Sequence, residues 1–318
     1  MQKTVLYILF VIISLSSAYG KSDYGNFYDK KRDRNIPYKV YYPDTLQGIY
    51  PVIIFSHGLG GSVEGGAYLG EHLSRNGYIC FHIQHEGSDE SVFRNAKSKE
   101  EVYRLLKESI KDYKNAVNRF QDVPFTVSSI ILLNSGDGTF TSHLDTNNIA
   151  IIGHSYGAKS VLISAGEKVG KVNFSFKDSR IKTGIALSPS LPVDESADLE
   201  RVYSDIDIPL FHITGTDDGD PLNQKSSFTP KDRTKPYRYI KGAPQYLLVL
   251  NKAVHSSFSG IKERSEEDPY IDEHIESVKK GITAFLNYYL KNNVSEGNWL
   301  QNEYKSTLSK KDVFEWKK

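Results

Sequence analysis

Hydrophobic residues along the chain gather in short apolar runs that alternate with amphipathic stretches. The runs are VIIF (52–55), YICFHI (78–83), IAII (149–152), IKTGIALS (181–188), IPLFHITG (208–215) and QYLLVLN (245–251). Runs of this length, rich in β-branched residues, are typical of strands buried on both faces. The amphipathic stretches between and after them are AYLGEHLSRNG (67–77), KEEVYRLLKESIKDYKNAVNRF (99–120), AKSVLISAGEK (158–168) and PYIDEHIESVKKGITAFLNYYLK (269–291). This alternation predicts an α/β fold, a doubly wound, mostly parallel sheet with helices on both faces.

The two ends of the chain have weaker patterns. PYKVYYP (37–43) alternates apolar and polar side chains, as expected of a strand near one edge of the sheet. The polar stretch 21–35 before it reads as an exposed lead-in, and the last stretch lacks clear periodicity. We therefore expect one catalytic-size domain over 21–295 and a loosely packed tail over 296–318.

The first twenty residues have the composition of a signal peptide. Lys3 precedes an apolar run from Val5 to Leu15, and Ala18 and Gly20 satisfy the small-x-small cleavage pattern. The run is shorter than the ~20 residues that a bilayer span requires. We expect cleavage after Gly20, a secreted or periplasmic protein, and a mature chain without a stable membrane span.

Charge, cysteine content and sequons limit the binding partners and covalent modifications that we expect. Lys and Arg together number 40 and Asp and Glu 39, a net charge of +1, which gives no reason to expect nucleic acid as a partner. The single cysteine, Cys80, cannot form an internal disulfide. Asn173 and Asn293 begin N-x-[ST] sequons, compatible with glycosylation in a eukaryotic host. The sequence leaves the oligomeric state open.

GHSYG at 153–157 stands between a predicted strand and a predicted helix. A serine between two glycines at such a junction is the pattern of a nucleophile elbow, a tight turn that lifts Ser155 above the sheet. In that arrangement the acid and then the base follow the serine along the chain. His255, in the loop AVHSSFSG after a strand, is the expected base. His274 lies inside a predicted helix and His212 inside a predicted strand, which favours structural roles for both.

The acid should lie at the end of the strand that precedes the base. ITGTDDGD supplies Asp217, Asp218 and Asp220, and we expect Asp218, with Asp217 as the alternative. Backbone N–H groups must also stabilise the oxyanion of the tetrahedral intermediate. HGLGG at 57–61 follows an earlier strand, so the amides of Leu59 and Tyr156 are the predicted donors.

HIQHEGSDE (82–90) collects two histidines and three carboxylates, which could suggest a metal site. Zinc sites are usually better spaced, and serine chemistry needs no metal. We expect no metal here and interpret this loop as a wall of the substrate cleft. The long stretch 219–244 is also expected to border the site, because long loops often serve binding.

The segments FSHGLGGSVEGGAYLGEHLSRNGYICFHIQHEGSDES and LDTNNIAIIGHSYGAKS resemble the platelet-activating factor acetylhydrolase and chlorophyllase-like group of α/β-hydrolases. HITGTDDGD and YLLVLNKAVHSSFSG extend the similarity, which is closest to bacterial proteins described as dienelactone hydrolases. The resemblance implies an α/β-hydrolase fold, a Ser–Asp–His triad and ester hydrolysis without a cofactor, with roles for Ser155, His255, Leu59 and Tyr156.

Two positions depart from that family pattern. Dienelactone hydrolases use a cysteine nucleophile, whereas position 155 is serine. The acetylhydrolases place their acid after an earlier strand, where this chain has Ser188, so the acid at Asp218 looks more like that of polyester-hydrolysing and lipase-like relatives.

The expected function is a secreted serine hydrolase of carboxylic esters, acting through an acyl-enzyme on small-molecule or lipid-like substrates. Two alternatives remain open. The same triad can cleave amides, so a serine peptidase is the first. A secreted binding protein that kept the fold without catalysis is the second.

Overall fold

The computed structural model describes residues 20–170, 174–190, 197–222, 227–260 and 268–318. Within them, nine strands form one sheet in the order β1-β2-β4-β3-β5-β6-β7-β8-β9. The strands are β1 (Lys21–Asp29), β2 (Arg34–Tyr42), β3 (Tyr50–Ser56), β4 (Ile79–Ile83), β5 (Leu144–His154), β6 (Ile181–Leu187), β7 (Leu210–Asp217), β8 (Gln245–Val254) and β9 (Val313–Lys317). The pairs from β4 to β8 are parallel, and β1, β2 and β9 join at the two edges in antiparallel pairs.

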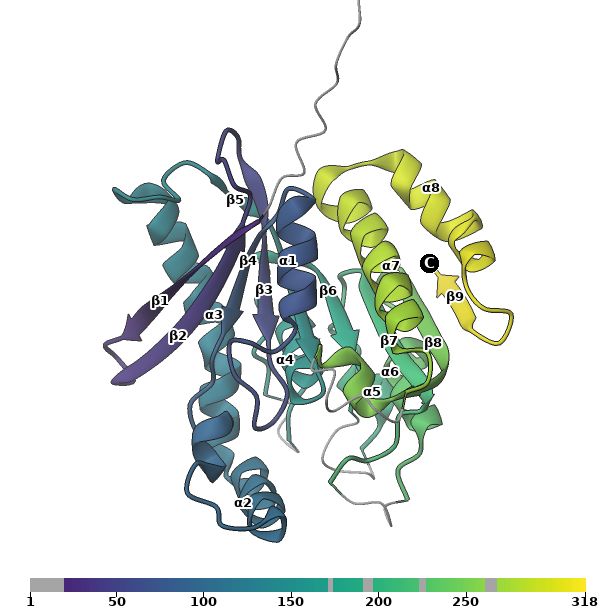
Figure 1. Cartoon of the computed structure of the whole chain (residues 1–318), viewed down its shortest axis with the longest axis horizontal. Coiled ribbons are helices and arrows are strands. Elements are labelled where there is room, and N and C mark those ends of the chain that lie inside the picture. The colour runs from purple at the N-terminus through teal and green to yellow at the C-terminus, as the bar shows by residue number, and fades with distance from the viewer. Residues whose placement is uncertain (1–19, 171–173, 191–196, 223–226, 261–267) are drawn as a thin grey trace, which may run out of the picture.

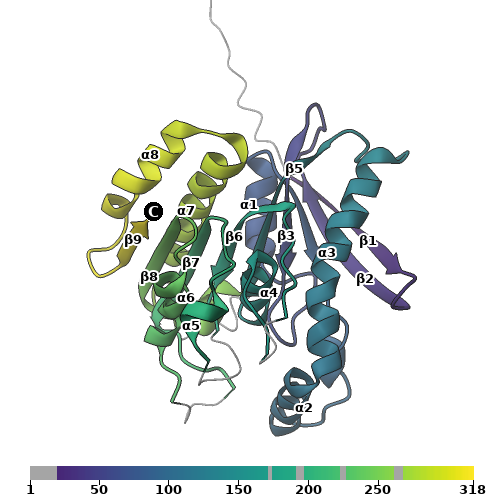
Figure 2. The same ribbon diagram turned by 180° about the vertical axis from the view of Figure 1, so that it is seen from behind.

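Helices cover both faces of this sheet (Figures 1 and 2). The α-helices are α1 (Ala67–Arg75), α2 (Lys99–Lys111), α3 (Tyr113–Ser135), α4 (Tyr156–Ala165), α5 (Leu199–Val202), α6 (Lys235–Tyr239), α7 (Ile271–Lys291) and α8 (Val294–Asn302). Short 3₁₀ helices are η1 (Glu90–Phe93), η2 (Pro230–Thr234), η3 (His255–Phe258) and η5 (Tyr304–Thr307). α1 and α7 pack on one face, and α3 and α4 pack on the other.

The strand β3 explains why its sequence is apolar throughout. Ile53 and Phe55 belong to the core cluster under α1 and α7, whereas Val52 and Ile54 belong to the cluster under α3 and α4. Successive side chains of a strand point to opposite faces, so a strand covered on both faces buries every residue. The predicted doubly wound, mostly parallel sheet is confirmed, and the architecture is that of an α/β-hydrolase.

The prediction of a loosely packed tail is wrong. α8 and η5 lie against α7, and β9 pairs with β8 at the sheet edge. Leu300, Tyr304 and Phe314 are buried in the core cluster on that face. Within VFEWK only the last four residues alternate apolar and polar, and so short a pattern does not stand out from the polar segment around it.

Two further expectations need correction. The lead-in before β2 is mostly exposed, as expected, but Lys21–Asp29 forms the edge strand β1, because its backbone pairs with β2 along its whole length. The single helix expected over 99–120 is two helices. Asp112 breaks it with an extended backbone, and its side chain accepts from the amides of Lys114 and Asn115 to cap α3.

The signal-peptide prediction for 1–20, except Gly20, and the sequon at Asn173 lie outside the described residues. Among the helices that the structure does describe, none combines the length and apolar character needed to cross a bilayer.

Candidate active site

Ser155 lies at the junction between β5 and α4 with φ 56° and ψ −113°. Such a positive φ is rare and strained for a residue with a side chain. The neighbouring glycines make the turn possible. A Cβ atom on Gly153 would lie 2.2 Å from the Gly157 carbonyl oxygen, and one on Gly157 would lie 1.8 Å from the Ser56 carbonyl oxygen. Both positions therefore admit only glycine, as expected for a nucleophile elbow.

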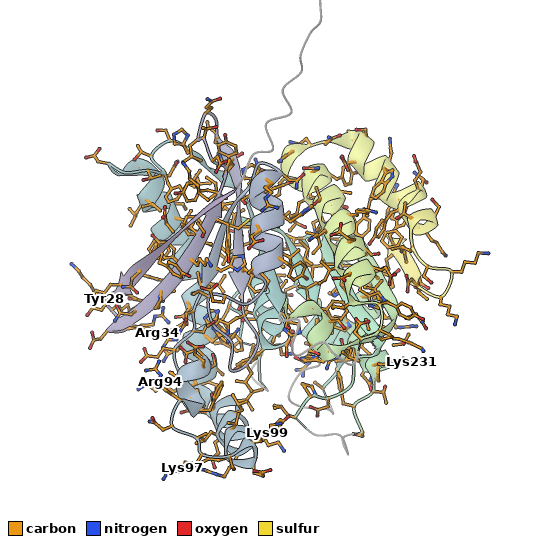
Figure 3. The ribbon with its side chains drawn as sticks, in the orientation of Figure 1. Tyr28, Arg34, Arg94, Lys97, Lys99 and Lys231 are labelled. Atoms are coloured by element: carbon orange, nitrogen blue, oxygen red, sulfur yellow. The ribbon has the colours of Figure 1, made fainter. Side chains whose placement is uncertain are left out.

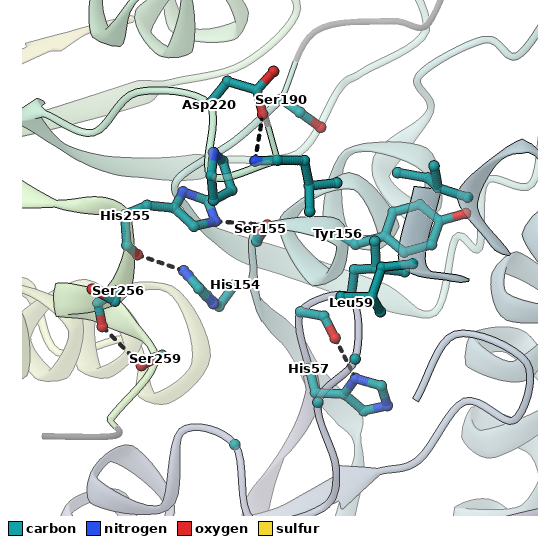
Figure 4. Close-up of a pocket in the computed structure, with 18 of the residues that line it drawn as sticks. His57, Leu59, His154, Ser155, Tyr156, Ser190, Asp220, His255, Ser256 and Ser259 are labelled. Carbon is teal, nitrogen blue, oxygen red and sulfur yellow. Dashed lines mark hydrogen bonds between the residues drawn. The ribbon is translucent and has the colours of Figure 1, made fainter. Parts of the chain in front are cut away.

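The other two predicted residues lie within hydrogen-bond distance of each other and of the serine. His255, the first residue of η3, places Nε2 2.9 Å from Ser155 Oγ (Figure 4). Its Nδ1 lies 2.8 Å from Asp218 Oδ1. An ionised carboxylate only accepts hydrogen bonds, so Nδ1 carries the proton and Nε2 is left to accept from the serine hydroxyl.

The remaining candidates lie elsewhere. Asp217 is exposed, and its carboxylate accepts from Thr216, so Asp218 rather than Asp217 contacts His255. His212 is buried in β7 beside Gln245, and His274 bonds to Asp268.

The charges around Asp218 keep its carboxyl group ionised. Burial alone would raise the pKa of Asp218, but Arg233 and His255 outweigh it and hold that pKa at about 2. The Arg233 Nε atom lies 2.7 Å from Asp218 Oδ1, and Thr214 Oγ1 donates to Oδ2 at 2.8 Å. Burial lowers the pKa of His255, with Asp218 acting in the opposite direction. The imidazole is therefore neutral at neutral pH and able to accept a proton.

His154, the residue before the serine, is a neighbour that the motif did not identify. Its side chain is buried, and its Nε2–H donates to the backbone carbonyl of His255 at 2.9 Å (Figure 4). Burial and the adjacent His255 lower the pKa of His154 to about 3, so it stays neutral. This hydrogen bond fixes the backbone at His255.

Leu59 and Tyr156 line the same pocket as Ser155, on the side away from His255 (Figure 4). A buried arginine of α3, Arg119, holds the two segments that carry them. It donates to the His57 carbonyl two residues before Leu59, and its guanidinium carbon lies 4.5 Å from the centroid of the Tyr156 ring. It also donates to the hydroxyl oxygens of Ser56, Ser88 and Ser160 at 3.0, 2.8 and 3.2 Å. No local sequence pattern marks this residue.

The loop at 82–90 does not form the cleft wall that we expected. His85 is fully buried, with Nδ1–H donating to Asp122 at 2.9 Å and Nε2 3.0 Å from Ser56 Oγ. Arg34 donates to both carboxylate oxygens of Asp122 at 2.8 Å. The histidines and carboxylates of this loop do not line the pocket; His85 instead supports the strand ends below it. In the described part of the chain, no three or more His, Cys, Asp or Glu side chains are grouped to hold a metal ion.

A pocket of about 1030 Å³ opens above Ser155 and His255. α2 and η1 form one wall and the segment after β7 forms the other. The prediction that 219–244 borders the site is therefore confirmed for the described residues between Asp220 and Lys235, whereas Lys241–Pro244 line a separate pocket. The apolar lining includes Leu59, Phe93, Val102, Leu106, Ile110, Leu222 and Phe228. The two walls can be followed in Figure 3, where Lys99 marks α2 and Lys231 marks η2 in the segment after β7.

Comparisons with known proteins point to one group of ester hydrolases. A family model described as platelet-activating factor acetylhydrolase, isoform II, matches residues 35–131. The platelet-activating factor acetylhydrolase of Bos taurus is 29% identical over 270 residues, covering 76% of this chain and 57% of the bovine protein. The protein of the same name from Canis lupus familiaris is 25% identical over 236 residues, covering 66% of this chain and 48% of its own length. The chain is thus similar in sequence to proteins named platelet-activating factor acetylhydrolase.

This relationship confirms the resemblance to the acetylhydrolase group of α/β-hydrolases. The likeness to bacterial dienelactone hydrolases stays a prediction. The chain spans about half the length of the curated relatives that it matches. The family model matches a segment that ends before Ser155, so the roles of Ser155, Asp218 and His255 are argued from geometry alone.

Proposed function

We propose that this chain is a serine carboxylic-ester hydrolase that acts on lipid-like esters. The observation that carries the proposal is the continuous path Asp218–His255–Ser155, with contacts of 2.8 and 2.9 Å, at the base of a largely apolar pocket. A serine hydroxyl needs an oriented base to become a nucleophile, and this path supplies both the base and the group that orients it.

In the proposed reaction Ser155 Oγ attacks the ester carbonyl while His255 Nε2 takes the hydroxyl proton. Asp218 stabilises the imidazolium, and the amides of Leu59 and Tyr156 donate to the oxyanion. The intermediate collapses by breaking the bond to the alcohol oxygen, which His255 protonates. Water, deprotonated by His255, then attacks the acyl carbon. The bond from that carbon to Ser155 Oγ breaks, His255 returns the proton to Oγ, and the carboxylic acid leaves.

The lipid-like substrate class follows from the pocket and from the relatives. A volume of about 1030 Å³ with apolar walls favours an acyl or alkyl chain beside the ester. The relatives from Bos taurus and Canis lupus familiaris are both named as acetylhydrolases. We also propose that the leader over 1–20 is cleaved after Gly20, which makes the enzyme secreted or periplasmic.

Hydrolysis of p-nitrophenyl esters, from acetate to palmitate, tests the proposal. Wild-type activity should disappear in Ser155→Ala, whereas Ser306→Ala, an exposed serine far along the chain, should retain it. Equal activity in wild type and Ser155→Ala would contradict the proposal. An amide with the acyl group of the best ester separates the two hydrolytic functions, since a peptidase would cleave both.

A further inference from the structure

One buried arginine joins the acid to the strand ends on either side of it. Arg233, in η2, is 2% exposed, and its Nε lies 2.7 Å from Asp218 Oδ1 and 2.8 Å from the Asp218 carbonyl. Its Nη1 donates to the carbonyls of Ser188 and Pro189 at 3.0 and 3.3 Å, and its Nη2 donates to Gly219 at 2.6 Å. A planar guanidinium can satisfy these acceptors together, which a lysine ammonium cannot. Arg233 therefore fixes the segments after β6 and β7 relative to each other.

The same arginine belongs to the pocket wall. Phe228, Asp232, Arg233 and Lys235 all line the pocket. The Arg233 guanidinium lies over the Phe228 ring, 4.8 Å from its centroid. A group that fills the pocket therefore meets the segment that also holds the acid.

The charge of Arg233 acts on the base as well. The groups that face His255 are Asp218 and Asp220 from the segment after β7, Arg233 from η2 and the neutral His154 from β5. The two carboxylates favour the imidazolium, and the guanidinium opposes it. A cation within a few ångströms of the acid offsets part of the negative charge that His255 experiences.

We propose that Arg233 is a positioning residue of the Ser155 centre, which holds the Asp218 carboxylate in place, offsets part of its charge at His255, and couples both to the pocket wall. The inference rests on the proposed function of Ser155, His255 and Asp218. It adds a residue outside the triad that sets the working pH range and links substrate binding to catalysis.

Arg233→Met and Arg233→Lys separate the charge of this residue from its geometry. Arg233→Met removes the charge, so the acid limb of the kcat/KM profile should move up by about one pH unit. Arg233→Lys keeps the charge but loses the planar contacts, so its acid limb should stay close to that of wild type. Both variants should lose about tenfold in kcat, because Asp218 is held less firmly.

The protonation of His255 is also followed by NMR in histidine-labelled protein without any substrate, assigned with His255→Gln. The His255 pKa should rise in Arg233→Met, while His72 of α1, bonded to Thr283, titrates as in wild type. An unchanged His255 pKa in folded Arg233→Met would overturn the inference. Because this readout needs no turnover, a failed ester assay leaves it intact and counts only against the proposed function.

Phe228→Leu provides a second test in case Arg233→Met does not fold. It alters the pocket wall beside Arg233 and leaves the contacts of Arg233 with Asp218 available. Coupling predicts that kcat falls as KM rises. A rise in KM with kcat unchanged would contradict the coupling, because it would make Phe228 a wall residue alone.

Discussion

Two buried arginines stand on opposite sides of Ser155 and differ in what they bind. Arg119, on the side of Leu59 and Tyr156 where we propose the oxyanion binds, is 0% exposed and donates to a carbonyl and three hydroxyl oxygens. Arg233, on the acid side, is 2% exposed and contacts the Asp218 carboxylate as well as four carbonyls. Arg119 joins α3 to the ends of β3 and α4, elements of the framework, whereas Arg233 joins segments that follow strands.

The different partners give the two arginines different roles: Arg119 stabilises the structure around the site, whereas Arg233 changes the charge near the reacting groups. A cation buried among neutral oxygens acts as a structural tie, because its hydrogen bonds satisfy backbone and hydroxyl groups that would otherwise be buried without partners. A cation paired with the acid changes the charge at the reacting groups. We therefore expect substitutions on the Arg119 side to change stability most and those on the Arg233 side to change the reaction most.

The largest expected effect is that of Asp218→Asn on the rate. An amide in place of the carboxylate can donate to Nδ1 and so favour the wrong tautomer of His255, so kcat should fall about 10⁴-fold. Asp217→Asn is the matched control, since Asp217 is exposed and is the neighbouring residue. Ester kinetics on both variants check the prediction. A larger loss for Asp217→Asn would mean that Asp217 is the acid, and the contact of Arg233 with Asp218 would then not bear on the reaction.

Arg119→Met should have the next largest effect, on stability. It leaves the His57 carbonyl and the hydroxyls of Ser56 and Ser88 without their donor, so the free energy of unfolding should fall by about 3 kcal/mol. Arg104→Met, at an arginine whose side chain is 56% exposed, should change it by less than about 0.5 kcal/mol. Urea unfolding measures both. Equal stabilities would make the framework role of Arg119 untenable.

Local pattern explains which parts of this site could be predicted. The elbow, the HGLGG loop and His255 are each recognisable in a few residues beside a predicted strand, and the structure brings them together around Ser155. Arg119 is 62 residues from the His57 carbonyl that it binds. Arg233 lies in a long loop without periodicity. Contacts made across such separations depend on the completed fold, so no single stretch of sequence marks these arginines.

The same distinction explains the edges of the sheet. The central strands could be predicted because burial on both faces makes them wholly apolar. β1 is mostly exposed and β9 is short, so backbone pairing with a neighbouring strand defines them more than side-chain composition does. A pattern of hydrophobicity does not report which strand supplies that pairing.

As the pH falls, the buried His85 should lose its contribution to stability before Asp218 does. Burial lowers the pKa of His85, beneath the oxyanion loop, to about 4. As the pH falls, His85 takes up a proton in the unfolded chain at a higher pH than in the folded chain. The free energy of unfolding is therefore unaffected by this side chain above about pH 6.5 and decreases progressively as the pH falls toward 4. The loss attributable to His85 should be about 3 kcal/mol, since lowering a pKa by one is worth about 1.4 kcal/mol. Asp218 loses its contribution only as the pH falls from about 4 toward its own pKa of about 2.

Urea unfolding at a series of pH values checks this order. His85→Gln should flatten the dependence of stability on pH between 6.5 and 4, whatever its stability at neutral pH. His143→Gln is the matched control. His143 lies beside Gly48 at the start of β5, the end of that strand away from Ser155. If His85→Gln left the slope of unfolding free energy against pH unchanged, protonation of His85 would not be the cause of the acid destabilisation.

The smallest expected effect concerns the acid limb of activity. Burial lowers the pKa of His255 below its ordinary value of 6.5 even though Asp218 acts to raise it. The base is therefore neutral, and able to accept the serine proton, at pH values where a free histidine is already half protonated. In wild type kcat/KM should stay constant from neutral pH down to below 6.5 and fall only at lower pH. A profile measured with the best ester decides this, since a limb at or above pH 6.5 would mean that the Asp218 charge dominates at His255 and that Arg233 does not offset it.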